Sequence, residues 1–299
     1  MPLPTRRPLL AAALLAAFGL ASPAFGQSKP LVVGGKNFTE QLLLAEMTTE
    51  LLKAKGLKAE KKDGLASALL RQAQEKGEVD VYWEYTGTAL VVYNKVEERL
   101  SPEQTYARVK ELDGKKGLVW GKPSTANNTY AIALPADQAQ AKNLRTLSDL
   151  AKVVESGNMK LATDGEFARR DDGLLGLQKA YGFTYPRANL VVMDPGLTYE
   201  ALRQGRVETA VVLSTDGRVK AFNFAVLQDD KNFFPSYVLA PVARKEALDA
   251  NPQLAAILDD LSGRLTEEVM RGLNAEVDVD KRDVRQVAAD FLRKQNLTQ

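Results

Sequence analysis

Cysteine and histidine are both absent from the 299 residues. Without them the chain cannot build a thiolate nucleophile, an imidazole base, a zinc–imidazole site or a serine–histidine relay. It cannot form a disulfide either, so its stability must come from burial of apolar surface. Carboxylates, lysines, hydroxyls and aromatic rings remain. This composition suits a binding protein better than most enzymes.

An excess of charge of one sign is also missing. The chain has 40 basic and 38 acidic residues, a net charge of +2, which gives no electrostatic case for binding nucleic acid or an anionic membrane surface. Hydrophobic residues make up 45%, which is ordinary for a globular protein. The length supports one large or two medium domains.

The N-terminal residues have the pattern of a secretory signal. Arg6 and Arg7 precede an apolar run over 9–20 that is too short to span a bilayer, and small residues then lead to Ala24-Phe25-Gly26. We therefore predict a signal peptide over 1–26, cleaved before Gln27, and a soluble periplasmic mature chain. An uncleaved membrane anchor is the alternative.

Short apolar strands alternate with amphipathic helices from residue 31 to about 241, which predicts an α/β fold with largely parallel sheets. The first strand is expected over 31–33, where Gly34-Gly35 ends it. Asn37 and Glu40 have the spacing of a capping box at the next helix. Residues 244–299 are predicted to be helices that pack against the first part of the chain.

The chain contains a weak internal repeat. Aligning Gly77 with Gly205 matches a helix, a glycine and a strand in both places, and puts Tyr85 opposite Leu213. Chance reuse of a common pattern is the alternative. A true repeat predicts two similar lobes that each direct a strand end toward a shared cleft, where open α/β sheets bind ligands.

Several residues are candidates for binding. Lys36 lies between a strand and a helix N-terminus, a place that favours a carboxylate, although a solvated surface lysine is the alternative. Tyrosines near strand ends could enclose a quaternary ammonium, each face contributing roughly 0.5–2 kcal/mol, or could simply pack. In the charged stretch 164–173 an arginine could clamp a carboxylate or form a surface ion pair. Adjacent acids such as Asp171-Asp172 rarely converge on a metal, so neither metal nor cofactor is expected.

At these positions the sequence resembles the substrate-binding proteins of ABC importers for glycine betaine, choline and related osmoprotectants. The resemblance covers nearly all of the mature chain and is carried by segments 35–41, 84–88, 127–130, 194–199, 214–217, 229–235 and 273–278.

The resemblance implies a two-lobed, type II-like periplasmic binding protein with two crossing strands as hinge. Lobe 1 would comprise 27–129 plus 237–299, with the C-terminal helices packed on it, and lobe 2 would comprise 130–236. The crossings would lie at 130–134 and 237–242.

The resemblance also implies roles for individual residues. Tyr85, Tyr130 and Tyr237 would form the cation cage, and Lys36, Thr88 and Arg170 would hold the carboxylate, with Arg169 as the competing assignment. Leu213 departs from the family, which often has tyrosine there; the missing ring should weaken cation binding by about 0.5–2 kcal/mol.

The expected function is that of a monomeric periplasmic solute-binding protein that closes on its ligand and docks on an importer permease. Glycine betaine is the first candidate ligand, with choline or carnitine next. The alternatives are a protein that binds another small solute such as an amino acid, a periplasmic enzyme that uses carboxylates and lysine, and a scaffold protein.

Overall fold

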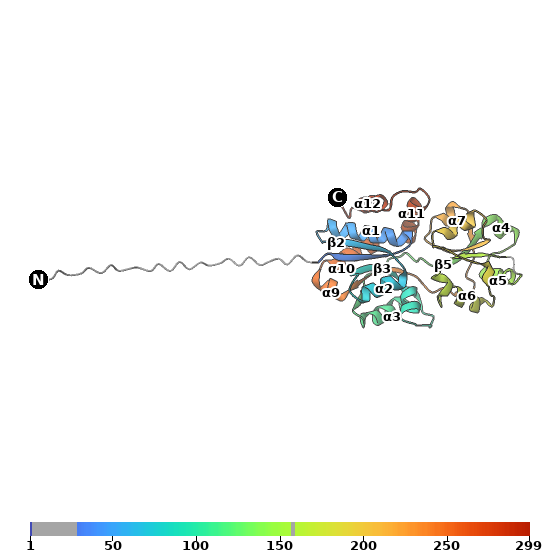
Figure 1. The fold of residues 1–299 in the computed structure, drawn as a ribbon, viewed down its shortest axis with the longest axis horizontal. Coiled ribbons are helices and arrows are strands. Elements are labelled where there is room, and N and C mark those ends of the chain that lie inside the picture. Colours follow the sequence, from blue (N-terminus) through green and yellow to red (C-terminus); the bar gives the residue numbers. More distant parts are fainter. Residues whose placement is uncertain (2–28, 157–158) are drawn as a thin grey trace.

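The computed structural model describes Met1, residues 29–156 and residues 159–299. The predicted signal segment therefore lies outside the described residues apart from Met1. The remaining chain forms two α/β lobes side by side, each built on a five-stranded sheet (Figure 1). The predicted two-lobed α/β fold is thus confirmed.

The first sheet has the strand order β2-β1-β3-β10-β4. Its strands are β1 (Leu31–Lys36), β2 (Ala59–Leu65), β3 (Val81–Tyr85), β4 (Leu118–Trp120) and β10 (Leu239–Arg244). β1 runs parallel to β2 and β3, whereas β10 is antiparallel to both β3 and β4. β10 comes from the far end of the chain and completes this sheet.

The second sheet has the order β7-β6-β8-β5-β9. It contains β5 (Tyr130–Pro135), β6 (Leu161–Thr163), β7 (Leu190–Val192), β8 (Thr209–Leu213) and β9 (Phe224–Val226). β6 runs parallel to β7 and β8, and β5 is antiparallel to β8 and β9. The pattern of parallel and antiparallel pairs matches that of the first sheet.

Helices cover both faces of the first sheet. They are α1 (Thr39–Ala54), α2 (Ser67–Glu75), the π-helix η1 (Thr88–Tyr93), α3 (Pro102–Gly114), α9 (Lys245–Ala250), α10 (Leu254–Arg264), α11 (Glu267–Asp278) and α12 (Val284–Lys294). Buried residues of α12, among them Phe291 and Leu292, share a core with Met47 and Leu51 of α1. The C-terminal helices therefore pack on the first lobe, as predicted (Figure 1).

Shorter helices surround the second sheet. They are α4 (Ala136–Ala141), α5 (Leu147–Val154), η2 (Phe167–Arg169), α6 (Leu174–Tyr181), η3 (Arg187–Asn189), α7 (Leu197–Arg203) and α8 (Arg218–Ala221). Successive residues of β5 pack in two different hydrophobic cores, Ile132 in one and Ala133 in the other. A strand that is buried on both faces is apolar along its whole length, and this is why the sequence predicted β5.

The chain crosses between the lobes just before β5 and β10. Asn127 and Val238 form an isolated antiparallel bridge there, and the Tyr237 amide donates to Asn127 Oδ1 at 2.7 Å. The strands that we expected at the crossings each belong to a single sheet. The boundaries at 129/130 and 236/237 remain proposals, supported by the sheet to which each strand belongs.

Two local predictions at the start of the chain were wrong. β1 does not end at Gly34 but continues to Lys36. Glycine is required at position 34 because an added Cβ would lie 2.5 Å from Leu70 and 2.8 Å from Val79. The capping box is also absent: Phe38 is the N-cap of α1 and makes no side-chain cap bond. Glu40 turns instead toward the space between the lobes.

No helix among the described residues has the length and apolar character needed to cross a membrane.

Candidate functional site

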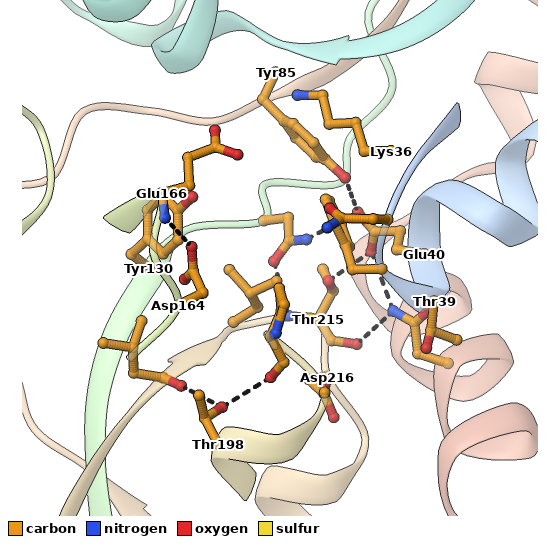
Figure 2. Close-up of a pocket in the computed structure, with 18 of the residues that line it drawn as sticks. Lys36, Thr39, Glu40, Tyr85, Tyr130, Asp164, Glu166, Thr198, Thr215 and Asp216 are labelled. Atoms are coloured by element: carbon orange, nitrogen blue, oxygen red, sulfur yellow. Dashed lines mark hydrogen bonds between the residues drawn. The ribbon is translucent and has the colours of Figure 1, made fainter. Parts of the chain in front are cut away.

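A cavity of about 200 Å³ lies between the lobes (Figure 2). Residues at the carboxyl ends of β1, β3, β6 and β8 contribute to its walls, in agreement with the position expected for a ligand in such sheets. All seven residues predicted to bind line it: Lys36, Tyr85, Thr88, Tyr130, Arg170, Leu213 and Tyr237. Arg169 is exposed and is not among the lining residues, so the geometry favours Arg170 of the two arginines.

The three predicted cage tyrosines come from both lobes. The rings of Tyr130 and Tyr237 meet edge to face, with centroids 5.5 Å apart at 89°. Tyr85, at the end of β3, lies 6.2 Å from the Phe38 ring in a stacked arrangement. Tyr85 and Tyr237 are almost fully buried and also belong to the core of the first lobe. The rings therefore combine packing with contact to the cavity.

The hydroxyls of two of the three tyrosines donate to carboxylates. Tyr85 Oη donates to Glu40 Oε1 at 2.7 Å, and Tyr237 Oη donates to Asp172 Oδ2 at 2.7 Å. Burial, followed by the charge of the neighbouring carboxylate, raises the pKa of both phenols well above the usual value. Both rings are therefore neutral and keep the electron-rich faces that attract cations.

Lys36 has a partner within the protein. Its Nζ lies 2.5 Å from Glu84 Oε1, and both side chains are buried. The same ammonium lies 4.9 Å from the centroid of the Tyr85 ring. Tyr82 Oη donates to the other Glu84 oxygen at 3.0 Å. Lys36 is thus a buried ion pair at the cavity wall, not the solvated surface lysine of the alternative interpretation.

Arg170 is buried and fully engaged. Its Nε and Nη2 grip Asp172 at 2.7 and 2.5 Å, and Nη2 also donates to Thr88 Oγ1 at 3.2 Å. Its Nη1 donates to Tyr130 Oη at 3.3 Å and to Glu166 Oε1 at 3.1 Å. These contacts account for all five N–H groups of a guanidinium. Through Thr88 they also connect the second lobe to the first.

Glu40 is a central residue of the site that sequence reasoning missed. It is buried and accepts hydrogen bonds from Thr215 Oγ1 (2.6 Å), Tyr85 Oη (2.7 Å), Asn128 Nδ2 (2.9 Å) and Asn274 Nδ2 (3.2 Å). Burial raises its pKa, and these four bonds oppose that rise. The donors come from both lobes and from the crossing, so Glu40 joins them at one point. Its place in the motif at 35–41 was the available signal.

Arg218 forms a further contact between the lobes that the sequence did not reveal. It binds Asp216 through Nε (2.9 Å) and Nη2 (2.6 Å), and Nη2 lies 3.3 Å from Asp278 Oδ2 on α11. Its guanidinium lies 4.0 Å from the centroid of the Tyr199 ring. The two lobes also approach each other closely here, because a Cβ added at Gly217 would lie 2.5 Å from the Cβ of Ala275.

Two further acids, Asp164 and Glu166, flank Tyr130 on the wall formed by the second lobe (Figure 2). Asp164 Oδ1 accepts from the amides of Glu166 (2.8 Å) and Phe167 (3.0 Å). Burial raises the pKa of Asp164. The sequence showed a charged stretch here but not which of its members face the cavity. Across residues 29–156 and 159–299, no group of three or more acidic side chains has the arrangement of a metal site.

Comparison with known proteins places the chain in a family. Residues 29–294 match the model of the substrate binding domain of ABC-type glycine betaine transport systems. The chain belongs to this family. It is the substrate-binding component of an ABC importer.

Individual relatives agree with this assignment. A glycine-betaine-binding protein of Pseudomonas aeruginosa is 43% identical over 97% of this chain and 95% of its own length. The glycine betaine-binding protein YehZ of Escherichia coli is 34% identical over 95% of this chain and 96% of its own length. These two relatives are therefore similar to this chain over nearly their whole length.

Solved structures share the fold. Apo YehZ from Escherichia coli, 34% identical, superposes with a TM-score of 0.65 over 91% of this chain and 100% of that chain. A structure described as a glycine betaine/carnitine/choline ABC transporter, 28% identical, gives a TM-score of 0.71 over 89% of this chain and 99% of that chain. The two-lobed architecture is thus that of solute-binding proteins.

Proposed function

We propose that this protein binds a small quaternary-ammonium solute between its lobes in the periplasm and delivers it to an importer permease. Glycine betaine, carnitine and choline are the candidates, since two relatives are glycine-betaine-binding proteins and a similar solved structure is described as a glycine betaine/carnitine/choline transporter. The observation that carries the proposal is the meeting of tyrosines from both lobes at one cavity, with Tyr130 and Tyr237 5.5 Å apart.

The tyrosine faces supply the attraction for the methylated nitrogen. Tyr85, Tyr130 and Tyr237 line the cavity and present neutral rings, each able to contribute roughly 0.5–2 kcal/mol to a desolvated cation. Leu213 adds apolar contact at the end of β8. Lys36 and Thr88 also line the cavity and supply donors for a ligand carboxylate, such as that of glycine betaine or carnitine.

Closure of the lobes couples binding to transport. The contacts of Glu40 with Thr215 and of Arg170 with Thr88 both span the lobes and form only when the lobes are together. A ligand that contacts both lobes adds to these bonds and stabilises the closed state. The permease then recognises this state, and the protein acts as a monomer without turnover of its ligand.

Isothermal titration of the mature chain tests the proposal. A panel of glycine betaine, choline, carnitine and several amino acids should give heat with at least one methylated ammonium, and the recovered ligand should be chemically unchanged. Tyr130→Leu should weaken binding by roughly 2- to 30-fold because one cation–π face is lost. Tyr106→Leu is the matched control, since Tyr106 lies on α3 and packs on Trp120 away from this cavity.

Absence of heat with every methylated ammonium would refute the proposal. Heat with amino acids alone would favour the rival in which the cleft takes a different solute.

A further inference from the structure

Helix α11 has one face in the core of the first lobe and another against the second lobe. Met270 and Leu273 belong to the core that α11 shares with α1. The other face lies against the turn 214–218, which follows β8. Its residues have the spacing i, i+3, i+4, i+7, which aligns them along one side of a helix. This contact face consists of Arg271, Asn274, Ala275 and Asp278.

The contacts of this face run outward from the crossing between the lobes. Arg271 Nη2 donates to the Ser214 carbonyl at 3.2 Å, and Ser214 Oγ donates to the Asn127 carbonyl in the crossing at 2.9 Å. At the other end of the face, Asp278 Oδ2 lies 3.3 Å from Arg218 Nη2. The two ends are about 10 Å apart along the helix, because each residue rises 1.5 Å. Rotation about the crossing therefore breaks the outer contacts first.

The turn 214–218 is held in shape by its own lobe. Asp216 Oδ1 accepts hydrogen bonds from the Arg218 amide and from Arg218 Nε, both at 2.9 Å. The Arg218 guanidinium lies 4.0 Å from the centroid of the Tyr199 ring, and its Nη1 donates to the Gly196 carbonyl at 3.1 Å. The turn therefore meets α11 as a preformed surface, and closure does not have to order it.

Gly217 allows the closest approach between the lobes. Its φ of −65° and ψ of −23° are open to every L-residue, so its backbone conformation does not require glycine. A Cβ at this position would lie 2.5 Å from Ala275 Cβ, 2.9 Å from Ala275 Cα and 3.1 Å from Ala275 N, its three nearest atoms. All three belong to the other lobe. An added methyl group therefore leaves the second lobe unstrained and obstructs only the joined lobes.

We infer that the contact face of α11 and the turn 214–218 form a closure clasp, which sets the balance between joined and separated lobes. Arg271, Ala275 and Gly217 are not among the residues that line the cavity. They act on affinity through closure, because the apparent dissociation constant is the intrinsic one divided by the fraction of joined lobes. The inference rests on the proposed function and adds residues that change the affinity for every ligand by the same factor.

Titration of Gly217→Ala tests the closure clasp. The mature variant should bind glycine betaine and choline about tenfold or more weakly than the wild type, by the same factor for each, because the added methyl group opposes closure. Ala275→Gly in the same chain removes the nearest clashing atom and should restore part of the affinity, which a folding defect would not show. Gly272→Ala is the matched control on α11, where an added Cβ meets no other described part of the chain within 4 Å.

The distance between the lobes tests the closure clasp without ligand. Because the chain has no cysteine, Leu69→Cys in α2 and Val192→Cys in β7 provide unique positions for spin labels, one on each lobe, and both side chains are exposed. Electron–electron double resonance should show a short distance in the labelled wild type that Gly217→Ala loses. Saturating ligand should restore part of the short-distance population in the variant.

The possible results separate the two proposals. Equal affinities and equal distance distributions in wild type and Gly217→Ala overturn the inference and leave the proposed function standing, and so does a loss confined to one ligand. Failure of the wild type to bind any methylated ammonium overturns the proposed function, and the ligand-free distances then decide the inference.

A second variant covers the case in which circular dichroism shows Gly217→Ala unfolded. Arg271→Gln loses the bonds from the guanidinium to the Ser214 carbonyl, which should weaken binding of both ligands by about 3- to 10-fold. Unchanged affinity in this variant overturns the inference.

Discussion

The two lobes have the same sheet but opposite chemistry at equivalent strand ends. In each sheet the central strand of the spatial order, β3 or β8, is preceded in the sequence by a helix and by a glycine with positive φ, Gly77 at 79° and Gly205 at 65°. β3 ends at Tyr85 and β8 ends at Leu213. The repeat seen in the sequence is therefore a structural equivalence.

The neighbouring strands carry the difference in charge. The register of β1 on β3 and of β6 on β8 places Lys36 and Asp164 at equivalent positions. The first lobe thus contributes a lysine and a tyrosine where the second contributes an aspartate and a leucine. Because the backbone frame is shared, side chains at strand ends can diverge without changing the fold, and we expect ligand selectivity to depend on these few positions.

The largest expected effect comes from breaking the buried arginine–aspartate ion pair that each lobe contains. Asp172→Ala removes the bidentate partner of Arg170, and Asp113→Ala removes the bidentate partner of Arg71. Each should lower the free energy of unfolding by about 3–5 kcal/mol, measured in urea, because a buried charge is left uncompensated. Only Asp172→Ala should also weaken ligand binding, since its partner Arg170 lines the cavity and Arg71 does not. Equal loss of binding in both variants would contradict the comparison.

The next effect concerns the contact between the lobes. Thr215→Val keeps the side-chain shape but removes the 2.6 Å bond to Glu40, which should cost about 1.5–3 kcal/mol as a hydrogen bond to a charged group. Small-angle scattering should show a larger radius of gyration as the lobes separate. Thr105→Val is the control, because the buried Thr105 Oγ1 has no hydrogen-bond partner among the described residues. An unchanged radius would show that Thr215 does not hold the lobes together.

Tyr85→Leu would make the end of β3 resemble the end of β8. Loss of one π-face should weaken binding of methylated ammonium ligands by roughly 2- to 30-fold. Titration with choline and glycine betaine should show a similar loss for both, since both carry the same trimethylated nitrogen. Unchanged affinity would mean that the cation does not touch Tyr85.

Leu213→Tyr makes the reciprocal change and should have the smallest effect. A ring at this position adds a cation–π face, which should tighten binding by at most roughly 2- to 30-fold. The larger side chain also takes up space in a cavity of about 200 Å³, which reduces this gain. The dissociation constant for the ligand measures the net effect. Weaker binding in this variant would show that the cavity requires the smaller leucine.

Much of the site could be predicted because its residues belong to short, ordered motifs. The motifs placed Tyr85 at the carboxyl end of a strand and Tyr130 and Tyr237 at or just before the starts of strands. Because β5 and β10 run antiparallel to β8 and β3, their starts lie at the same sheet edges as the carboxyl ends of β8 and β3. The alternation of strands and helices predicted the fold class for the same reason. Arg170 was separated from Arg169 only in the structure, because adjacent residues point in different directions.

The partners of the charged residues could not be predicted. Lys36 pairs with Glu84, which lies 48 residues away, and Glu40 bonds with Asn274 of α11, 234 residues away. Local spacing instead assigned Glu40 to a helix cap. The four donors gathered around it by tertiary packing stabilise a different position of the side chain.

The amino-acid order by itself determined the alternation of strands and helices, the repeat that builds two similar lobes, and the presence of tyrosines at strand ends, because periodicity and turn residues act over short distances. Only the tertiary structure decided which charges neutralise one another and which face the cavity. Ion pairs and burial depend on residues that the fold brings together from distant parts of the chain, and these set the charge that a ligand meets.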